Sequence, residues 1–87
     1  MTLSIVDPGA DISQALREAI ESSIPDAKAQ VNGGAGHYEI SVTAAAFASK
    51  TLLEKQRMVY RVIKPLMSGE DAPVHAIDKL ETLLPDS

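Results

Sequence analysis

Residues 27–44 read AKAQVNGGAGHYEISVTA, and this stretch decides the fold. In the first part, residues 27–32 alternate alanine and valine with polar side chains. In the second part, residues 37–44 alternate Tyr38, Ile40 and Val42 with polar side chains. A period of two is typical of half-buried strands, and a glycine-rich connection between two such segments predicts a β-hairpin.

The glycine loop, residues 33–36, can be interpreted in three ways. A phosphate-binding loop needs a Lys-Ser/Thr pair after its last glycine and a helix behind it, and both are missing. The G-x-x-G clamp of KH domains joins two helices and carries a basic residue, whereas this loop joins two predicted strands and carries none. A hairpin turn needs only the positive φ angles that glycine supplies. We therefore favour the turn, which is compatible with the loop also flanking a site.

A helix is predicted before the hairpin, because apolar residues recur there at spacings of three and four. These residues are Ile12, Ala15, Leu16, Ala19 and Ile20. The helix is expected to begin near Asp11 and to close at Pro25. Residues 1–10 show no sustained period and are expected to form a flexible arm, which leaves residues 11–87 as a single domain.

A second helix is predicted after the hairpin. Thr51 and Glu54 have the spacing of a capping box, in which each side chain satisfies a backbone amide of the other residue. An apolar stripe follows at helical spacing, formed by Leu52, Val59, Ile63 and Leu66. Pro65 is expected to end or kink this helix, and residues 68–73 form a polar loop.

The C-terminal segment allows two interpretations. Residues 74–77 suit a short strand, whereas Ile77, Leu80 and Leu83 would also suit one face of a helix. We favour a strand that enters from the loop. The predicted class is then α+β in the order α-β-β-α-β, with a small mixed three-stranded sheet and helices packed on one face.

Composition narrows the classes of function. The chain has 87 residues, no cysteine, 45% hydrophobic residues and a net charge of −4. A chain this short without disulfides favours a reducing compartment, and no apolar run approaches the ~20 residues of a membrane span. We therefore expect a soluble, cytoplasmic protein without membrane association. The lack of cysteine excludes thiol catalysis, and the acidity argues against a general nucleic-acid binder.

The basic residues are nevertheless concentrated. Five of the eight Lys and Arg residues fall within residues 50–64, a segment that holds a single acid, Glu54. Lys50, Arg57, Arg61 and Lys64 lie opposite the apolar stripe on a helical wheel, and we call these four residues the basic face. This arrangement is either a solvated surface or a docking site for an acidic partner or nucleic acid.

The two histidines are the remaining candidates for chemistry. His37 opens a predicted strand, where a solvated polar residue is the simplest interpretation. His75 lies among apolar neighbours in VHAI, where a hydrogen-bonded structural histidine is the simplest interpretation. Two histidines alone make a poor metal site, because structural zinc requires four ligands. No Ser-His-Asp set and no spaced carboxylate pair is present, so an enzyme is not expected.

Two segments together resemble the BolA family. They are residues 33–63, GGAGHYEISVTAAAFASKTLLEKQRMVYRVI, and residues 72–77, APVHAI. The resemblance lies in the histidine-aromatic pair after a glycine loop, the Phe47 and Thr51-Leu52 positions, the R-x-V-Y motif and the V-H-A-I motif. It extends over about residues 12–82. Residues 78–85, DKLETLLP, depart from the family pattern by an insertion or rearrangement.

The resemblance implies a KH-like α+β fold of class II type and a protein partner. BolA-like proteins pair with monothiol glutaredoxins and can share a bridged [2Fe–2S] cluster, to which glutaredoxin and glutathione contribute thiolates. The family's Val/Ile-His-Ala histidine corresponds to His75. A second ligand comes from the region between the first two strands, where His37 is the available side chain. The isolated chain is then expected to hold no cluster and to be a monomer or weak homodimer.

Two other functions stay open. Some members of the BolA family are described as DNA-binding transcriptional regulators of cell morphology and stress response, and the resemblance implies that the basic face would serve that role here. Alternatively, the domain could heterodimerise without any cluster, with both histidines merely structural.

Overall fold

The computed structural model describes residues 8–69 and 71–85. Its elements are α1 (Pro8–Ser23), β1 (Lys28–Gly34), β2 (His37–Thr43), the short 3₁₀ helix η1 (Ala45–Phe47), α2 (Leu52–Met67) and β3 (Ala76–Leu83). The predicted α+β class and the order α-β-β-α-β are confirmed.

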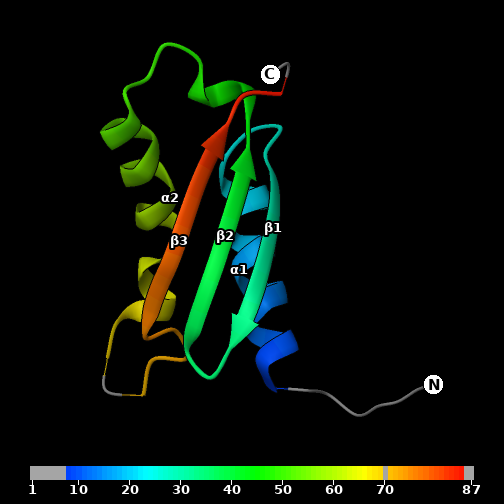
Figure 1. Cartoon of the computed structure of the whole chain (residues 1–87), viewed down its shortest axis with the longest axis vertical. Coiled ribbons are helices and arrows are strands. Elements are labelled where there is room, and N and C mark those ends of the chain that lie inside the picture. The colour runs from blue at the N-terminus through cyan, green and yellow to red at the C-terminus, as the bar shows by residue number, and fades with distance from the viewer. Residues whose placement is uncertain (1–7, 70, 86–87) are drawn as a thin grey trace, which may run out of the picture.

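The three strands form one mixed sheet in the order β1-β2-β3. The central strand β2 pairs antiparallel with β1 and parallel with β3. Both helices lie on the same side of this sheet, behind it in Figure 1. Tyr38, Ile40 and Val42 are buried beneath the helices while Glu39 is exposed, as the period of two predicts.

The glycine loop is a two-residue hairpin turn. Gly34 pairs with His37, and the two residues between them, Ala35 and Gly36, have φ angles of 55° and 85°. Positive φ at both central positions defines a type I′ turn, whose twist matches that of the flanking strands. The turn interpretation is therefore confirmed, and β1 extends two residues further into the loop than expected.

The helix α1 begins earlier than expected, whereas α2 begins where it was predicted to begin. The helix α1 begins at Pro8, three residues before Asp11, because proline is well suited to the first helical position. Of the expected arm, residues 8–10 are thus helical, and residues 1–7 lie outside the described residues. The helix α2 begins with the predicted Thr51–Glu54 capping box.

The structure corrects two points about α2, namely that Pro65 ends the helix and that Leu52 belongs to its buried stripe. Pro65 lies inside the helix, which continues to Met67, so the proline does not end it. Leu52 is 61% exposed and does not join the buried stripe. It lies in the first turn of α2, whereas Val59 and Ile63, further along, are fully covered.

The strand β3 begins later and runs further than predicted. It spans Ala76–Leu83, so the helical alternative is wrong and His75 lies just before the strand rather than within it. The pairing with β2 shifts at one point: Tyr38 pairs with Ile77, but Glu39 pairs with Lys79. Asp78 is the extra residue, and this β-bulge accommodates an insertion without changing the rest of the strand.

The buried core contains only apolar and tyrosine side chains, and the β3 residues Ile77 and Leu80 pack against it while partly buried. Leu16 and Ile20 come from α1, Phe47 from η1, and Val74 from the loop before β3. No helix in the described part of the chain is long and apolar enough to cross a membrane.

Candidate functional site

The tertiary structure brings the two histidines to the same end of the sheet. His37 is the first residue of β2 and pairs with Ala76, the first residue of β3. His75 therefore lies one residue before the position opposite His37. This proximity arises because β2 and β3 are parallel and begin at the same edge, although the chain passes through α2 between them.

The backbone of His75 is held by the hairpin turn. Its N–H donates to the carbonyl oxygen of Gly36 at 2.8 Å, and the N–H of Ala76 donates to the same oxygen at 3.0 Å. The imidazole lies against Gly36, where a β-carbon would overlap the ring. Gly36 thus provides both the positive φ of the turn and the space for the His75 ring. His75 is exposed to solvent.

His37 has a carboxylate partner. Its Nδ1 atom lies 3.2 Å from Oδ1 of Asp78, and the two side chains are 60% and 52% exposed. Asp78 occupies the β3 bulge. A carboxylate on Nδ1 favours the tautomer that carries its proton there and leaves the Nε2 lone pair free for a ligand. Sequence reasoning missed Asp78, although the departure from the family pattern in residues 78–85 pointed to this segment.

The donors at this end are suited to a shared site. Among the residues that the structure describes, no three His, Cys, Asp or Glu side chains are placed to hold a metal ion. The chain contributes up to two imidazoles and no thiolate. A metal or cluster bound here would therefore need further ligands from another molecule.

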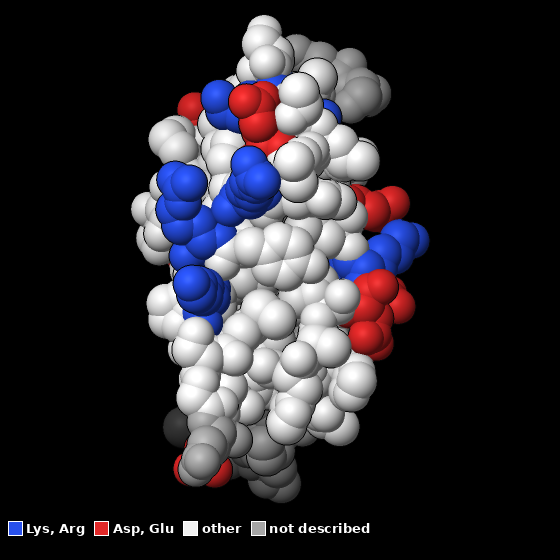
Figure 2. All heavy atoms as spheres, turned by 90° about the vertical axis from the view of Figure 1, so that its left-hand side faces the viewer, with Lys and Arg blue, Asp and Glu red and all other residues white. Residues whose placement is uncertain are grey.

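The basic face lies on α2 and on the loop that precedes this helix. Lys50 precedes the helix, while Arg57, Arg61 and Lys64 border a shallow hollow of about 560 Å³, together with Tyr60 and neighbouring residues. Figure 2 shows the Lys and Arg side chains gathered on one side of this surface. None of the four cations forms an ion pair within residues 8–69 and 71–85.

Exposed apolar residues accompany the basic face. On α2, Leu52, Leu53 and Tyr60 are 61%, 54% and 38% exposed. Clusters of exposed apolar and basic side chains on one helix are typical of interaction surfaces. Sequence reasoning found the cations but missed the leucines, because helical spacing alone assigned Leu52 to the core.

The basic face and the histidines are neighbours in the fold. The N–H of Val74 donates to the carbonyl oxygen of Leu66 at 3.1 Å, which joins the last turn of α2 to the residue before His75. The hollow extends to Met67 and Ser68 at that same end of the helix. A single partner could therefore contact both features at once.

A BolA-like protein family model matches residues 12–86, which include both histidines and the whole of α2. The chain belongs to the BolA-like family. No curated protein sequence matches it significantly.

Solved structures agree with the BolA-like assignment. A BolA homologue from Coxiella burnetii is 24% identical, with a TM-score of 0.72 over 94% of this chain and 95% of that one. The XC975 protein is 36% identical, with a TM-score of 0.58 over 85% and 89% of the two chains. Yeast Fra2 is 26% identical, with a TM-score of 0.63 over 85% and 80%. This chain has the BolA fold over nearly its full length.

Proposed function

We propose that this BolA-like protein is a non-enzymatic adaptor that binds a monothiol glutaredoxin and helps to hold or transfer a [2Fe–2S] cluster. This chain contributes two ligands to the cluster, His75 as the first and His37 as the second. Glutaredoxin and glutathione contribute the thiolates. The observation that carries the proposal is the placement of two exposed histidines at one end of the sheet, in a chain that has no thiolate of its own.

The environment of His75 supports a ligand role. Backbone hydrogen bonds from His75 and Ala76 to the carbonyl oxygen of Gly36 fix the main chain here, so only the side-chain torsions of the imidazole need ordering when a partner binds. Its surroundings are solvent and a glycine rather than a buried hydrogen-bond partner. A purely structural histidine would be expected to use its ring nitrogens within the protein.

The pairing of His37 with Asp78 supports the second ligand. Histidines that bind metals commonly donate their other ring N–H to a carboxylate, which orients the ring and raises its basicity. Neutral imidazoles are competent ligands for [2Fe–2S] irons, as in Rieske centres. A cluster held between two chains would be accessible for transfer, because both histidines lie at the surface.

The surface on α2 supports partner docking. It combines the basic face with Leu52, Leu53 and Tyr60, and its C-terminal end borders the loop that carries His75. Unpaired cations steer an acidic partner, while apolar groups contribute most of the binding free energy.

The proposal can be tested by anaerobic mixing with a glutathione-loaded, cluster-bearing monothiol glutaredoxin. Visible absorption and circular dichroism would be recorded for wild type, His75→Ala, His37→Ala and the control Glu81→Ala, which alters an exposed residue of β3. We expect a changed spectrum in a one-to-one heterodimer, lost in His75→Ala, weakened in His37→Ala and retained in the control. Sedimentation of the same mixtures without the cluster would show whether each variant still binds glutaredoxin, and would therefore distinguish loss of partner binding from loss of a cluster ligand.

Two outcomes would contradict the cluster role. If the spectrum stays that of the glutaredoxin homodimer, this chain does not ligate the cluster. If a heterodimer forms but its spectrum is unchanged in both histidine variants, the chain docks without contributing a ligand. The second outcome would favour heterodimerisation with structural histidines.

A second candidate function is that of a DNA-binding regulator of transcription. The unpaired cations Arg57, Arg61 and Lys64 around an exposed tyrosine favour it, while the net charge of −4 opposes it. It predicts duplex DNA binding whose affinity falls steeply with salt and falls again in Arg57→Gln/Arg61→Gln. Salt-independent or absent binding would exclude it.

A further inference from the structure

Within residues 8–69 and 71–85, no strand pairs with the outer edge of β1, because β1 is the first strand in the sheet order. In the pairing with β2, Gly34 and His37 flank the two-residue turn and form a hydrogen-bonded pair. Counting back from this pair, Ala29, Val31 and Gly33 direct their N–H and C=O groups outward. The Ala29 N–H confirms this alternation, since it donates at 3.0 Å to the Glu21 side chain rather than to β2.

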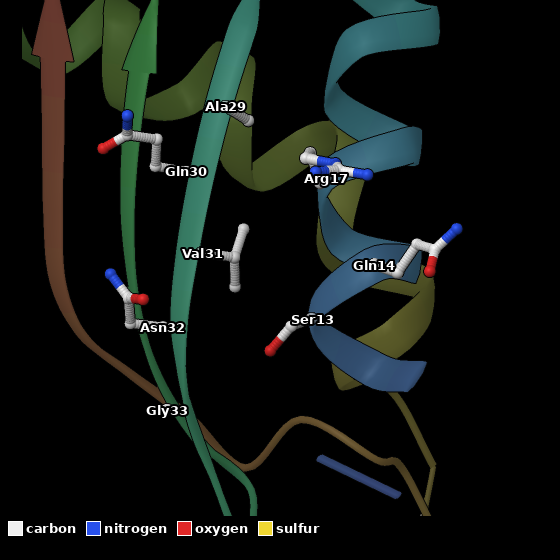
Figure 3. A pocket seen from close by; sticks show the side chains of 8 residues that line it. All are labelled: Ser13, Gln14, Arg17, Ala29, Gln30, Val31, Asn32 and Gly33. Carbon is white, nitrogen blue, oxygen red and sulfur yellow. The ribbon is translucent and has the colours of Figure 1, made fainter. Parts of the chain in front are cut away.

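The same edge forms one wall of a groove. The groove has a volume of about 610 Å³ and lies between β1 and the first turns of α1. Its lining residues are Ser13, Gln14 and Arg17 on α1 and residues 29–33 on β1. Figure 3 shows Val31 pointing from β1 toward α1, and Gln30 and Asn32 pointing away from α1.

The outward N–H and C=O groups of β1 are arranged as they would be for pairing with a further strand. The Ala29 amide is already satisfied by the carboxylate of Glu21. The outward amides of Val31 and Gly33 have no partner among the residues that the structure describes. Alternating free N–H and C=O groups on an edge strand are the recognition elements of β-strand addition.

One charge distinguishes this groove. Among the described residues, Arg17 is the only charged side chain that lines it, and Figure 3 shows this side chain over the α1 ribbon. The two nearby acids accept hydrogen bonds from residues of the groove lining rather than from Arg17: Glu18 accepts from Gln14, and Glu21 accepts from Ala29. Arg17 forms no ion pair in the described part of the chain. A guanidinium without an ionic partner is complementary to a carboxylate.

We propose that the β1 edge and the adjoining α1 groove bind an extended, acidic peptide segment of a partner protein. The segment adds to the sheet beside β1, hydrogen-bonds to Val31 and Gly33, and places a carboxylate on Arg17. A second copy of this chain fits less well, because residues 28–34 contain Lys28 and no acid, and would leave the guanidinium unpaired. This inference does not depend on the proposed cluster function, whose residues lie at other positions.

The test uses the full ¹⁵N-labelled chain and a panel of acetylated, amidated heptapeptides of alternating threonine and valine. Each peptide carries one glutamate at a different position, and each has a glutamine counterpart. We expect at least one glutamate peptide to shift the amide resonances of Val31 and Gly33. Its glutamine counterpart should bind about fivefold more weakly, and Arg17→Gln should remove that preference.

A backbone variant separates strand addition from simple charge attraction. Val31→Pro deletes an outward N–H that is not used by β2, and proline is tolerated on edge strands. We expect it to preserve the rest of the amide spectrum while the peptide no longer shifts Gly33. If peptide binding survives Val31→Pro unchanged, strand addition is wrong.

Three further outcomes would overturn the proposal. The first is a panel that leaves the Val31 and Gly33 amides unmoved at millimolar concentration. The second is a shift of these amides with protein concentration alone, together with a dimer in sedimentation, which would identify a second copy as the occupant. The third is tighter binding of a single-stranded oligonucleotide than of any peptide to the same amides.

Discussion

The Nδ1 atom of His37 lies 3.2 Å from the Oδ1 atom of Asp78, although the two residues are 41 positions apart in the sequence. Two features of the sheet produce this pairing. The strands β2 and β3 run parallel from the same edge, and the bulge at Asp78 gives β3 one residue that has no partner on β2. A bulge of this kind redirects a side chain, and here the carboxylate meets the histidine.

Asp78→Asn tests whether this carboxylate orients His37 for a cluster. We expect release of the cluster from the glutaredoxin complex to become about tenfold faster, because a neutral amide holds the tautomer less firmly. Folding stability should change by less than about 1 kcal/mol, because the pair is exposed. The measurement is the anaerobic decay of visible absorption after addition of a chelator. Glu81→Gln is the control, and equal rates for both variants would exclude the orienting role.

Gly36→Ala tests the contact between the turn and His75. Alanine at this position must adopt φ near 85° and its β-carbon would overlap the imidazole, so we expect a loss of about 1–2 kcal/mol. Urea unfolding measures this loss, and the His75 resonances report displacement of the ring. Gly34→Ala is the control, since its β-carbon would meet nothing within 4 Å and its φ is not positive. We expect it to stay within about 0.5 kcal/mol of wild type.

The next prediction compares two apolar residues of α2. Ile63→Ala should destabilise the fold by about 2–5 kcal/mol, because the side chain is fully buried and its loss leaves a cavity. Leu52→Ala should change stability by no more than about 0.5 kcal/mol, because Leu52 is 61% exposed. Instead, Leu52→Ala should weaken glutaredoxin binding. Equal destabilisation by both variants in urea would show that Leu52 is buried in solution.

The capping box of α2 predicts a pH dependence of stability. The pKa of Glu54 is held below its ordinary value of 4.5, chiefly by the hydrogen bond from the Thr51 backbone amide. The Thr51 hydroxyl and the charges of Lys50 and Arg57 lower this pKa further, and partial desolvation opposes them. The folded state therefore favours the carboxylate. Its contribution to stability is present above pH 4.5 and is lost as pH falls through the lowered pKa.

Glu54→Gln tests this dependence because glutamine keeps a capping oxygen but cannot titrate. Between about pH 7 and about pH 3, the melting temperature of wild type should fall further than that of Glu54→Gln. Because the largest cause is a hydrogen bond, high salt should reduce the difference only in part. Identical pH profiles for the two proteins would contradict the lowered pKa.

Local patterns in the sequence were sufficient for most of the architecture. The alternation in residues 27–44 predicted the hairpin, since a period of two and a glycine turn are local properties of the chain. The Thr51–Glu54 capping box was likewise predictable, because both of its hydrogen bonds join residues three positions apart. The V-H-A-I motif directed attention to His75 without any coordinates.

Only the tertiary structure decided which residues lie together. Pro65 looked like a helix end, yet α2 continues to Met67, and Val74, packed in the core, donates its N–H to the carbonyl oxygen of Leu66. The bulge that brings Asp78 to His37 depends on strand register, which is set by contacts between segments 41 residues apart. The free edge of β1 beside Arg17 depends on strand order. Register and strand order are long-range properties, because they arise when distant segments bury their apolar faces together.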